Sequence, residues 1–287
     1  MTVPEYVGVL GGGRMGAGIA HAFLIAGANV VVVEQTEEWA QGARGRVLSS
    51  VKNSVARGAV SETEEEISSR FSVATTPEAF ENAGLVVEAV PEQFDLKLAA
   101  LTGVERVVAD DAWIATNTSS LSVQRLGSQL SIPSRFGGLH FFNPVPASTL
   151  VEIVVADTTS GDYAIQAAGW VEALGKTSIT VRDSPGFASS RLGLAIALEA
   201  MRMVEEGVAS AADIDVAMEL GYKHPVGPLR TSDLVGLDVR LGIAEYLFDT
   251  IGPRFEPPQI LRDLVARGDL GRKTGKGFFD YGTEGAK

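Results

Sequence analysis

The sequence of 287 residues contains no cysteine, and its three histidines, His21, His140 and His224, lie far apart. The absence of cysteine excludes disulfide bonds, thiolate metal ligands and cysteine nucleophiles. Because the histidines are few and scattered, we expect no metal site. Positive charge is scarce too, since 24 Lys and Arg residues stand against 36 Asp and Glu, a net charge of −12. This balance argues against nucleic acid or an anionic membrane as a partner, and a phosphate-bearing ligand would need a local cluster of basic groups.

The sequence also lacks a recognisable targeting segment or membrane span. Residues 1–6 carry no positive charge, and a glycine-rich turn interrupts the first apolar run at Gly11. Residues 15–33 contain no Asp, Glu, Lys or Arg, and these 19 residues have the length of a membrane span. However, Gly27-Ala28-Asn29 indicates a turn between a helix and a strand. With 45% hydrophobic and 21% charged residues, we expect a soluble, cytoplasmic globular protein.

The first half of the chain alternates short β-rich runs with helical stretches, which is typical of an α/β protein with a doubly wound parallel sheet. We expect helices at 15–26 and 39–57, and strands at 6–10, 30–33, 85–89, 113–116, 136–139, 151–155 and 179–181. Beyond Asp183-Ser184-Pro185-Gly186 strand signals nearly vanish, and helices are expected at 191–206, 211–220 and 234–248. We therefore predict one domain at 1–184 and an all-α domain at 185–287.

The helix expected around residues 192–204 is apolar on nearly all sides. A helix of this kind needs burial by more than one neighbour. We favour a homodimer formed through the helical domain; the alternative is a helix central to its own domain.

A dinucleotide-binding loop follows the first predicted strand. Gly11, Gly13 and Gly16 fit G-x-G-x-x-G, and the motif opens a helix. In that setting the glycines permit a tight turn, a close approach to a pyrophosphate and tight helix packing. Glu34 follows the next predicted strand, at a position where a carboxylate hydrogen-bonds ribose hydroxyls and repels a 2′-phosphate. The next residue, Gln35, is not an arginine that could bind such a phosphate. The sequence therefore favours NAD over NADP. The cofactor-binding candidates here are Gly11, Gly13, Arg14, Met15, Gly16, Glu34 and Gln35.

Three polar segments interrupt apolar sequence and suggest a catalytic centre: residues 115–120, which include Asn117 and Ser119, residues 139–144, which include His140, and Glu152. The first two follow strands, and ligands collect at the carboxyl ends of parallel strands. Removing a hydride from an alcohol requires loss of the hydroxyl proton, a task suited to a histidine base. Glu152 would orient and stabilise that histidine, and Ser119 would bond the same oxygen. Taken singly, His140 could be a core histidine and Ser119 a helix cap.

The sequence resembles the NAD-dependent L-3-hydroxyacyl-CoA dehydrogenases, especially the short-chain 3-hydroxybutyryl-CoA type, over almost its whole length. The resemblance is carried by GGGRMGAGIA (11–20), VEAVPEQ (87–93), NTSSLS (117–122), GLHFFNPVPASTLVEI (138–153), DSPGFASSRL (183–192), HPVGP and DLVGLD within 213–238, and LGRKTGKGFFDY (270–281). It implies a Rossmann-like domain followed by a helical dimerisation domain, an NAD cofactor and an acyl-CoA substrate.

The resemblance also implies roles for individual residues. His140 matches the catalytic base, Glu152 its orienting partner, and Ser119 the serine at the reacting oxygen of the substrate. Residues that contact or surround NAD are matched by Glu34, Glu92, Lys97, Asn143 and Lys273, and Asn117 and Ser119 join them as candidates. Ser50 and Arg57 match positions that bind the CoA portion, where a positive charge suits its phosphates.

One position departs from the family pattern. Where the family usually carries asparagine near the substrate carbonyl, this chain has Ser190. Serine keeps one donor and one acceptor but is shorter than the amide, so substrate orientation or the preferred acyl chain is expected to differ. Two alternatives stay open: a related dehydrogenase of a sugar acid or free hydroxy acid, and a non-enzymatic dinucleotide-binding protein.

Overall fold

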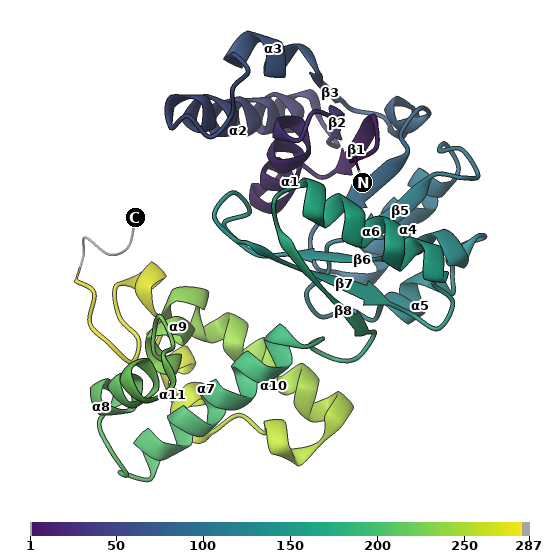
Figure 1. The fold of residues 1–287 in the computed structure, drawn as a ribbon. Helices are drawn as coiled ribbons and strands as arrows, with labels where there is room; N and C mark the ends of the chain where they lie inside the picture. The colour runs from purple at the N-terminus through teal and green to yellow at the C-terminus, as the bar shows by residue number, and fades with distance from the viewer. Residues whose placement is uncertain (1, 283–287) are drawn as a thin grey trace. The chain divides into compact units, whose positions relative to one another are not determined.

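The computed structural model describes residues 2–282, which fall into two compact units divided between Ser184 and Pro185. The first unit contains every strand of the sheet, and the second is helical (Figure 1). Within residues 2–282, no helix combines the length and the apolar character needed to cross a bilayer.

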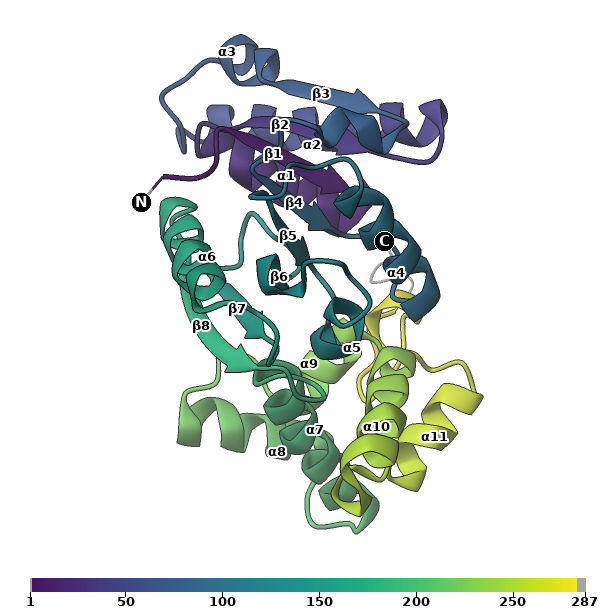
Figure 2. The same ribbon diagram turned by 90° about the vertical axis from the view of Figure 1, so that its right-hand side faces the viewer.

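The first unit is built on one eight-stranded sheet with the order β3-β2-β1-β4-β5-β6-β7-β8 (Figure 2). Every neighbouring pair is parallel except β6 and β7, which are antiparallel. The strands are β1 (Tyr6–Leu10), β2 (Asn29–Val33), β3 (Phe71–Ala74), β4 (Leu85–Glu88), β5 (Trp113–Thr116), β6 (Phe136–Phe141), β7 (Leu150–Val155) and β8 (Thr177–Arg182).

Helices cover both faces of this sheet. One face packs against α1 (Arg14–Ile25), α2 (Glu37–Ala56) and α6 (Gly161–Ala173), whose apolar residues form one core cluster with alternate residues of β1, β2 and β4–β7. The opposite face carries α4 (Phe94–Glu105) and α5 (Val123–Gly127). The remaining elements of this unit are α3 (Glu64–Ser69) and the 3-10 helices η1 (Pro77–Phe80) and η2 (Pro133–Arg135).

Local sequence explains where several elements begin. Gly27 has φ +94° and turns the chain from α1 into β2. Thr36 caps α2 by accepting a hydrogen bond from the Trp39 amide, and Thr63 forms a capping box with Glu66 at the start of α3. Such caps satisfy amide groups that the first helical turn leaves without intrahelical partners.

The second unit packs α7 (Ser189–Glu205), α9 (Pro228–Val235), α10 (Leu237–Ile251) and α11 (Gln259–Ala266) around its own apolar core. Buried members of that core include Leu194, Leu198, Leu229 and Leu247. The remaining elements are α8 (Ala211–Val216), the π-helical turn η3 (Ala217–Gly221), and the 3-10 helices η4 (Pro253–Phe255) and η5 (Arg272–Thr274).

The predicted fold class is confirmed, with three corrections. The sheet is not wholly parallel, because β7 runs against β6. The single helix expected at 234–248 is wrong, since Gly236, with φ +106°, separates α9 from α10. The α-helix expected at 211–220 ends at Val216 and continues as a π-helical turn.

Candidate active site

The glycine-rich loop joins β1 to α1 at the carboxyl edge of the sheet. Gly11 has φ +93°, a conformation that side chains disfavour, and a Cβ at Gly16 would collide with the carbonyl of Gly11. These two glycines are therefore required by the protein itself. Gly13 differs, because a Cβ there would meet no protein atom within 4 Å.

The surroundings of Gly13 fit a dinucleotide. A glycine that the protein does not need is explained by close approach of a ligand to the backbone, and Gly13 is also the N-cap of α1. At the end of β2 the Glu34 carboxylate accepts a hydrogen bond from the Gly12 amide, 2.7 Å from Oε1. This bond fixes an acidic group beside the loop, which suits ribose hydroxyls. Arg14 and Gln35 are exposed nearby, whereas Met15 packs partly against the core.

Strand alternation places four polar side chains on the sheet face that carries α4 and α5. On each of β4, β5, β6 and β7, alternate residues belong to the core cluster of the other face. The residues between them face α4 and α5, and they include Glu88, Thr116, His140 and Glu152. All four are buried. Because buried polar groups need partners, their mutual contacts determine the chemistry of this face.

His140 and Glu152 lie directly opposite each other in the antiparallel β6–β7 pair. Nδ1 of His140 is 2.7 Å from Oε2 of Glu152, and Nε2 of His140 is 3.1 Å from Oγ of Ser119. Glu152 is 0% exposed and His140 is 4% exposed. A carboxylate only accepts hydrogen bonds, so Nδ1 carries a hydrogen, and in the neutral form of an imidazole the other nitrogen, here Nε2, is then an acceptor. The imidazole therefore presents a basic nitrogen beside the serine hydroxyl.

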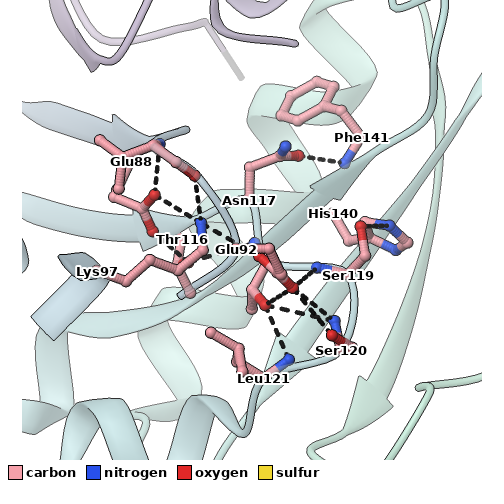
Figure 3. Close-up of polar contacts among 12 residues, drawn as sticks. Glu88, Glu92, Lys97, Thr116, Asn117, Ser119, Ser120, Leu121, His140 and Phe141 are labelled. Carbon is pink, nitrogen blue, oxygen red and sulfur yellow. Dashed lines mark hydrogen bonds and ion pairs between the residues drawn. The ribbon is translucent and has the colours of Figure 1, made fainter. Parts of the chain in front are cut away.

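Glu92 holds the loop that carries Ser119. Its Oε1 accepts hydrogen bonds from the Thr118 hydroxyl (2.5 Å). It also accepts hydrogen bonds from the Ser119 amide (2.9 Å) and the Ser120 amide (3.0 Å), as Figure 3 shows. Burial opposes ionisation of this carboxyl, but the Lys97 ammonium and these hydrogen bonds outweigh it and lower the pKa of Glu92. An ionised Glu92 thus fixes the position of Ser119.

A buried ion pair between Lys97 and Glu88 contacts Glu92, which holds this loop. Nζ of Lys97 is 2.7 Å from Oε1 of Glu88 and 3.4 Å from Oε2 of Glu92. Glu88 also accepts a hydrogen bond from the Thr116 hydroxyl at 2.6 Å (Figure 3). Burial raises the pKa of Glu88, although Lys97 and Thr116 partly offset the effect. The Glu88–Lys97 pair thus connects the end of β4 to α4.

Sequence reasoning assigned no role to Glu88, Thr116 or Thr118, although Thr116 and Thr118 lie in the polar segment 115–120. Glu88 could have been found because it lies inside the apolar β4 run, where an isolated carboxylate needs a partner.

Asn117 connects the two strand ends that carry Ser119 and His140. Its Oδ1 accepts a hydrogen bond from the Phe141 amide at 2.9 Å (Figure 3). Asn143 is exposed and precedes Pro144 through a cis peptide bond. Asn117 thus has a structural task in addition to the cofactor contact predicted for it.

The other predicted site residues lie outside this cluster. Ser50 bonds the Arg46 carbonyl within α2, and the exposed Arg57 is the C-cap of that helix. In the helical unit, Ser190 is partly exposed in the first turn of α7, and Lys273 forms an ion pair with Asp238 (2.6 Å).

Comparison with known proteins agrees with this geometry. Residues 6–184 match the NAD binding domain of 3-hydroxyacyl-CoA dehydrogenase, and residues 186–281 match its C-terminal domain. A 3-hydroxybutyryl-CoA dehydrogenase from Mycobacterium tuberculosis is 40% identical over 283 residues, which cover 96% of this chain and 98% of that protein.

Two solved structures share the fold. The (S)-3-hydroxybutyryl-CoA dehydrogenase from Ralstonia eutropha has a TM-score of 0.93 and 36% identity, covering 98% of this chain and all of that one. A diketoreductase has a TM-score of 0.85 at 26% identity, with 98% of this chain and 100% of that chain covered. The predicted family and NAD cofactor are confirmed: the chain is a member of the 3-hydroxyacyl-CoA dehydrogenase family and an NAD-dependent oxidoreductase.

Proposed function

We propose that this chain catalyses the reversible oxidation of a short (S)-3-hydroxyacyl-CoA to the 3-ketoacyl-CoA, with His140 as base, Glu152 as its positioning residue and Ser119 at the reacting oxygen. The observation that carries the proposal is the buried Glu152–His140–Ser119 series, with heavy-atom distances of 2.7 and 3.1 Å. It lies in the domain that matches the family's NAD-binding domain.

The proton balance follows from the tautomer of His140. Nε2 accepts the proton of the 3-hydroxyl, and the carbon–oxygen bond becomes a carbonyl as C3 loses its hydrogen with the bonding pair. Bound NAD supplies the acceptor for that hydride. As His140 becomes positively charged, the buried Glu152 carboxylate stabilises it through a charge-assisted hydrogen bond. In the reverse direction His140 returns the proton to the ketone oxygen.

Binding of NAD is assigned to the loop of Gly11, Gly13 and Gly16, with Glu34 at the ribose. The open backbone at Gly13 and the helix N-terminus support this assignment. Glu92 and Lys97 position the Ser119 loop, and Asn143 and Lys273 are assigned to the surroundings of the cofactor from the resemblance alone.

Binding of CoA is assigned to Ser50 and Arg57 on α2, and Ser190 is assigned to catalysis, near the carbonyl of the substrate. A homodimer, formed through α7, and a cytoplasmic location also belong to the proposal. Leu192 and Ile196 on α7 are 64% and 38% exposed in the single chain, which supports a partner for that helix.

The experiment that tests the function compares acetoacetyl-CoA with free acetoacetate as oxidants of NADH, followed by absorbance. We expect rapid oxidation with the thioester and none with the free acid. Equal rates with both would favour a dehydrogenase that does not recognise CoA. This alternative is considered because a diketoreductase has a similar fold. No oxidation with these substrates or with longer 3-ketoacyl-CoA esters would contradict the proposal.

A further inference from the structure

Arg46 on α2 contacts the glycine-rich loop. Its Nε donates a hydrogen bond to the carbonyl oxygen of Gly12 at 3.0 Å, and Gly12 is the residue between the first two glycines of the motif. The amide of the same residue donates to Glu34 at 2.7 Å. The backbone of Gly12 is thus held by an acidic side chain from the end of β2 and by a basic side chain from α2. Sequence reasoning assigned no role to Arg46.

The two terminal nitrogens of the Arg46 guanidinium, Nη1 and Nη2, are available to another partner. Among residues 2–282, neither nitrogen has a hydrogen bond, and no carboxylate forms an ion pair with Arg46. Carboxylates are not scarce, because the chain has 36 Asp and Glu residues against 24 Lys and Arg. Both terminal nitrogens of Arg70, in the same unit, bond Glu62 at 2.6 and 3.0 Å. Since Nε is bonded to the loop, the planar fork of Arg46 is held in place and stays open to an anion.

Gly42 leaves the space that this guanidinium occupies. It lies one turn before Arg46 on α2, and a Cβ there would be 3.4 Å from Nη1 and 3.6 Å from Nη2. The three atoms nearest to that Cβ all belong to Arg46, so no other part of the protein explains the glycine. Glycine inside a helix is unfavourable relative to alanine. A surface arginine that is only solvated would need neither the bond to Gly12 nor the space at Gly42.

The loop that Arg46 contacts is suited to phosphate. Gly13, the next residue after Gly12, is the N-cap of α1, and the amides of a helix N-terminus attract anions. Arg14, in the first turn of α1, and Arg46 add two full positive charges at this loop. In a chain with a net charge of −12, a phosphate-bearing ligand needs a local cluster of basic groups, and these two arginines supply it.

We propose that Arg46 binds a phosphate group of the nucleotide held at this loop, through Nη1 and Nη2. The inference rests on the assignment of NAD to the loop in the proposed function and adds a residue that recognises it. A guanidinium forms two parallel, charge-assisted hydrogen bonds with a phosphate. NAD and CoA each contain a pyrophosphate, so either nucleotide is a possible source of the phosphate. The bond between Arg46 and Gly12 favours NAD, because the glycine-rich loop is the place where a dinucleotide brings its pyrophosphate close to the backbone.

The test separates the phosphate contact from the hydrogen bond to the loop. In Arg46→Gln the amide nitrogen takes the position of Nε along the side chain, so the variant keeps a donor for the Gly12 carbonyl and loses the charged fork. We expect Arg46→Gln to raise the dissociation constant of NADH at least about fivefold in a fluorescence titration at low ionic strength, a modest loss because solvent screens an exposed arginine. The loss should shrink in high salt, and Arg46→Lys should retain part of the affinity. Gly42→Leu, which fills the space beside Nη1, should weaken binding as well.

A second measurement identifies the source of the phosphate. The KM for acetoacetyl-CoA is determined at saturating NADH, and a rise in this KM alone, with unchanged NADH affinity, would assign the phosphate to CoA. The matched control is Lys52→Gln, which removes an exposed cation of the same helix and should leave both constants at their wild-type values.

Two results would overturn the inference. One is an Arg46→Gln protein with wild-type constants for both nucleotides. The other is a loss that appears in Arg46→Met but not in Arg46→Gln, which would show that only the hydrogen bond to Gly12 matters. Gly13→Ala separates this failure from that of the proposed function. If Gly13→Ala weakens NADH binding and Arg46→Gln does not, only the role of Arg46 is wrong; if neither variant weakens it, the assignment of NAD to the loop is wrong too.

Discussion

Replacing Glu152 by glutamine tests the electrostatic task of the buried dyad. The side chain keeps its volume, but the carboxylate 2.7 Å from Nδ1 of His140 becomes a neutral amide. A hydrogen bond to a charged group contributes about 1.5–3 kcal/mol and a neutral one about 0.5–1.5 kcal/mol. The difference of about 1–2 kcal/mol concerns the state in which His140 is positively charged. At 1.36 kcal/mol per factor of ten, kcat/KM should fall by at least about 5- to 30-fold.

The loss becomes larger if the amide donates to Nδ1. Nε2 would then carry the hydrogen, and the general base would be lost, a contribution of roughly 10²–10⁴. The assay is NADH oxidation by acetoacetyl-CoA, with unfolding curves to establish that the variant folds. Glu172→Gln, the same exchange at an exposed position of α6, is the matched control and should retain wild-type rates. A folded Glu152→Gln protein with kcat/KM within twofold of wild type would refute the reasoning.

Three further predictions concern residues outside the dyad. Gly13→Ala should weaken NADH binding at least about tenfold in a fluorescence titration without lowering stability, because the new Cβ meets no protein atom; unchanged affinity would contradict the close approach. Lys97→Met should cost about 3–5 kcal/mol of unfolding free energy at pH 8, since it leaves Glu88 buried without its cation. That cost should shrink as pH falls, because burial raises the pKa of Glu88, and a pH-independent cost would contradict this. Burial, with a smaller effect of Lys176, lowers the pKa of His21 below 6.5, so the folded state binds fewer protons than the unfolded state. Stability should therefore fall by up to about 1.4 kcal/mol per unit as pH drops below 6.5, and His21→Gln should remove that dependence in chemical unfolding; the same slope in both proteins would contradict it.

Much of the sheet could be predicted because its strands carry strong local signals. β1 and β5 have the predicted bounds, since continuous apolar runs end there at glycine or at polar residues. β3 was missed because its four residues, FSVA, are too short and mixed to stand out. The break between α9 and α10 depends on a positive φ at Gly236, and the sequence does not distinguish that glycine from one tolerated within a helix.

The site could be predicted where a charged or polar residue interrupts an apolar run. Glu152 in an apolar run needed a partner, and strand pairing places it opposite His140. The direction of β7 was not predicted, yet this antiparallel pairing brings the two side chains together. The Glu88–Lys97 ion pair could not be predicted from the sequence, because burial of both groups depends on how α4 packs on β4. The catalytic and binding roles given to individual residues stay predictions.

The most direct test of the central claim is the rate of His140→Ala with acetoacetyl-CoA, measured together with its affinity for NADH. His224→Ala, outside the cluster, provides the matched control. The account predicts that kcat/KM of His140→Ala falls at least about 10²-fold while the dissociation constant for NADH stays within a few-fold of wild type. A variant that binds NADH and reduces acetoacetyl-CoA at the wild-type rate would contradict the assignment of His140 as the base.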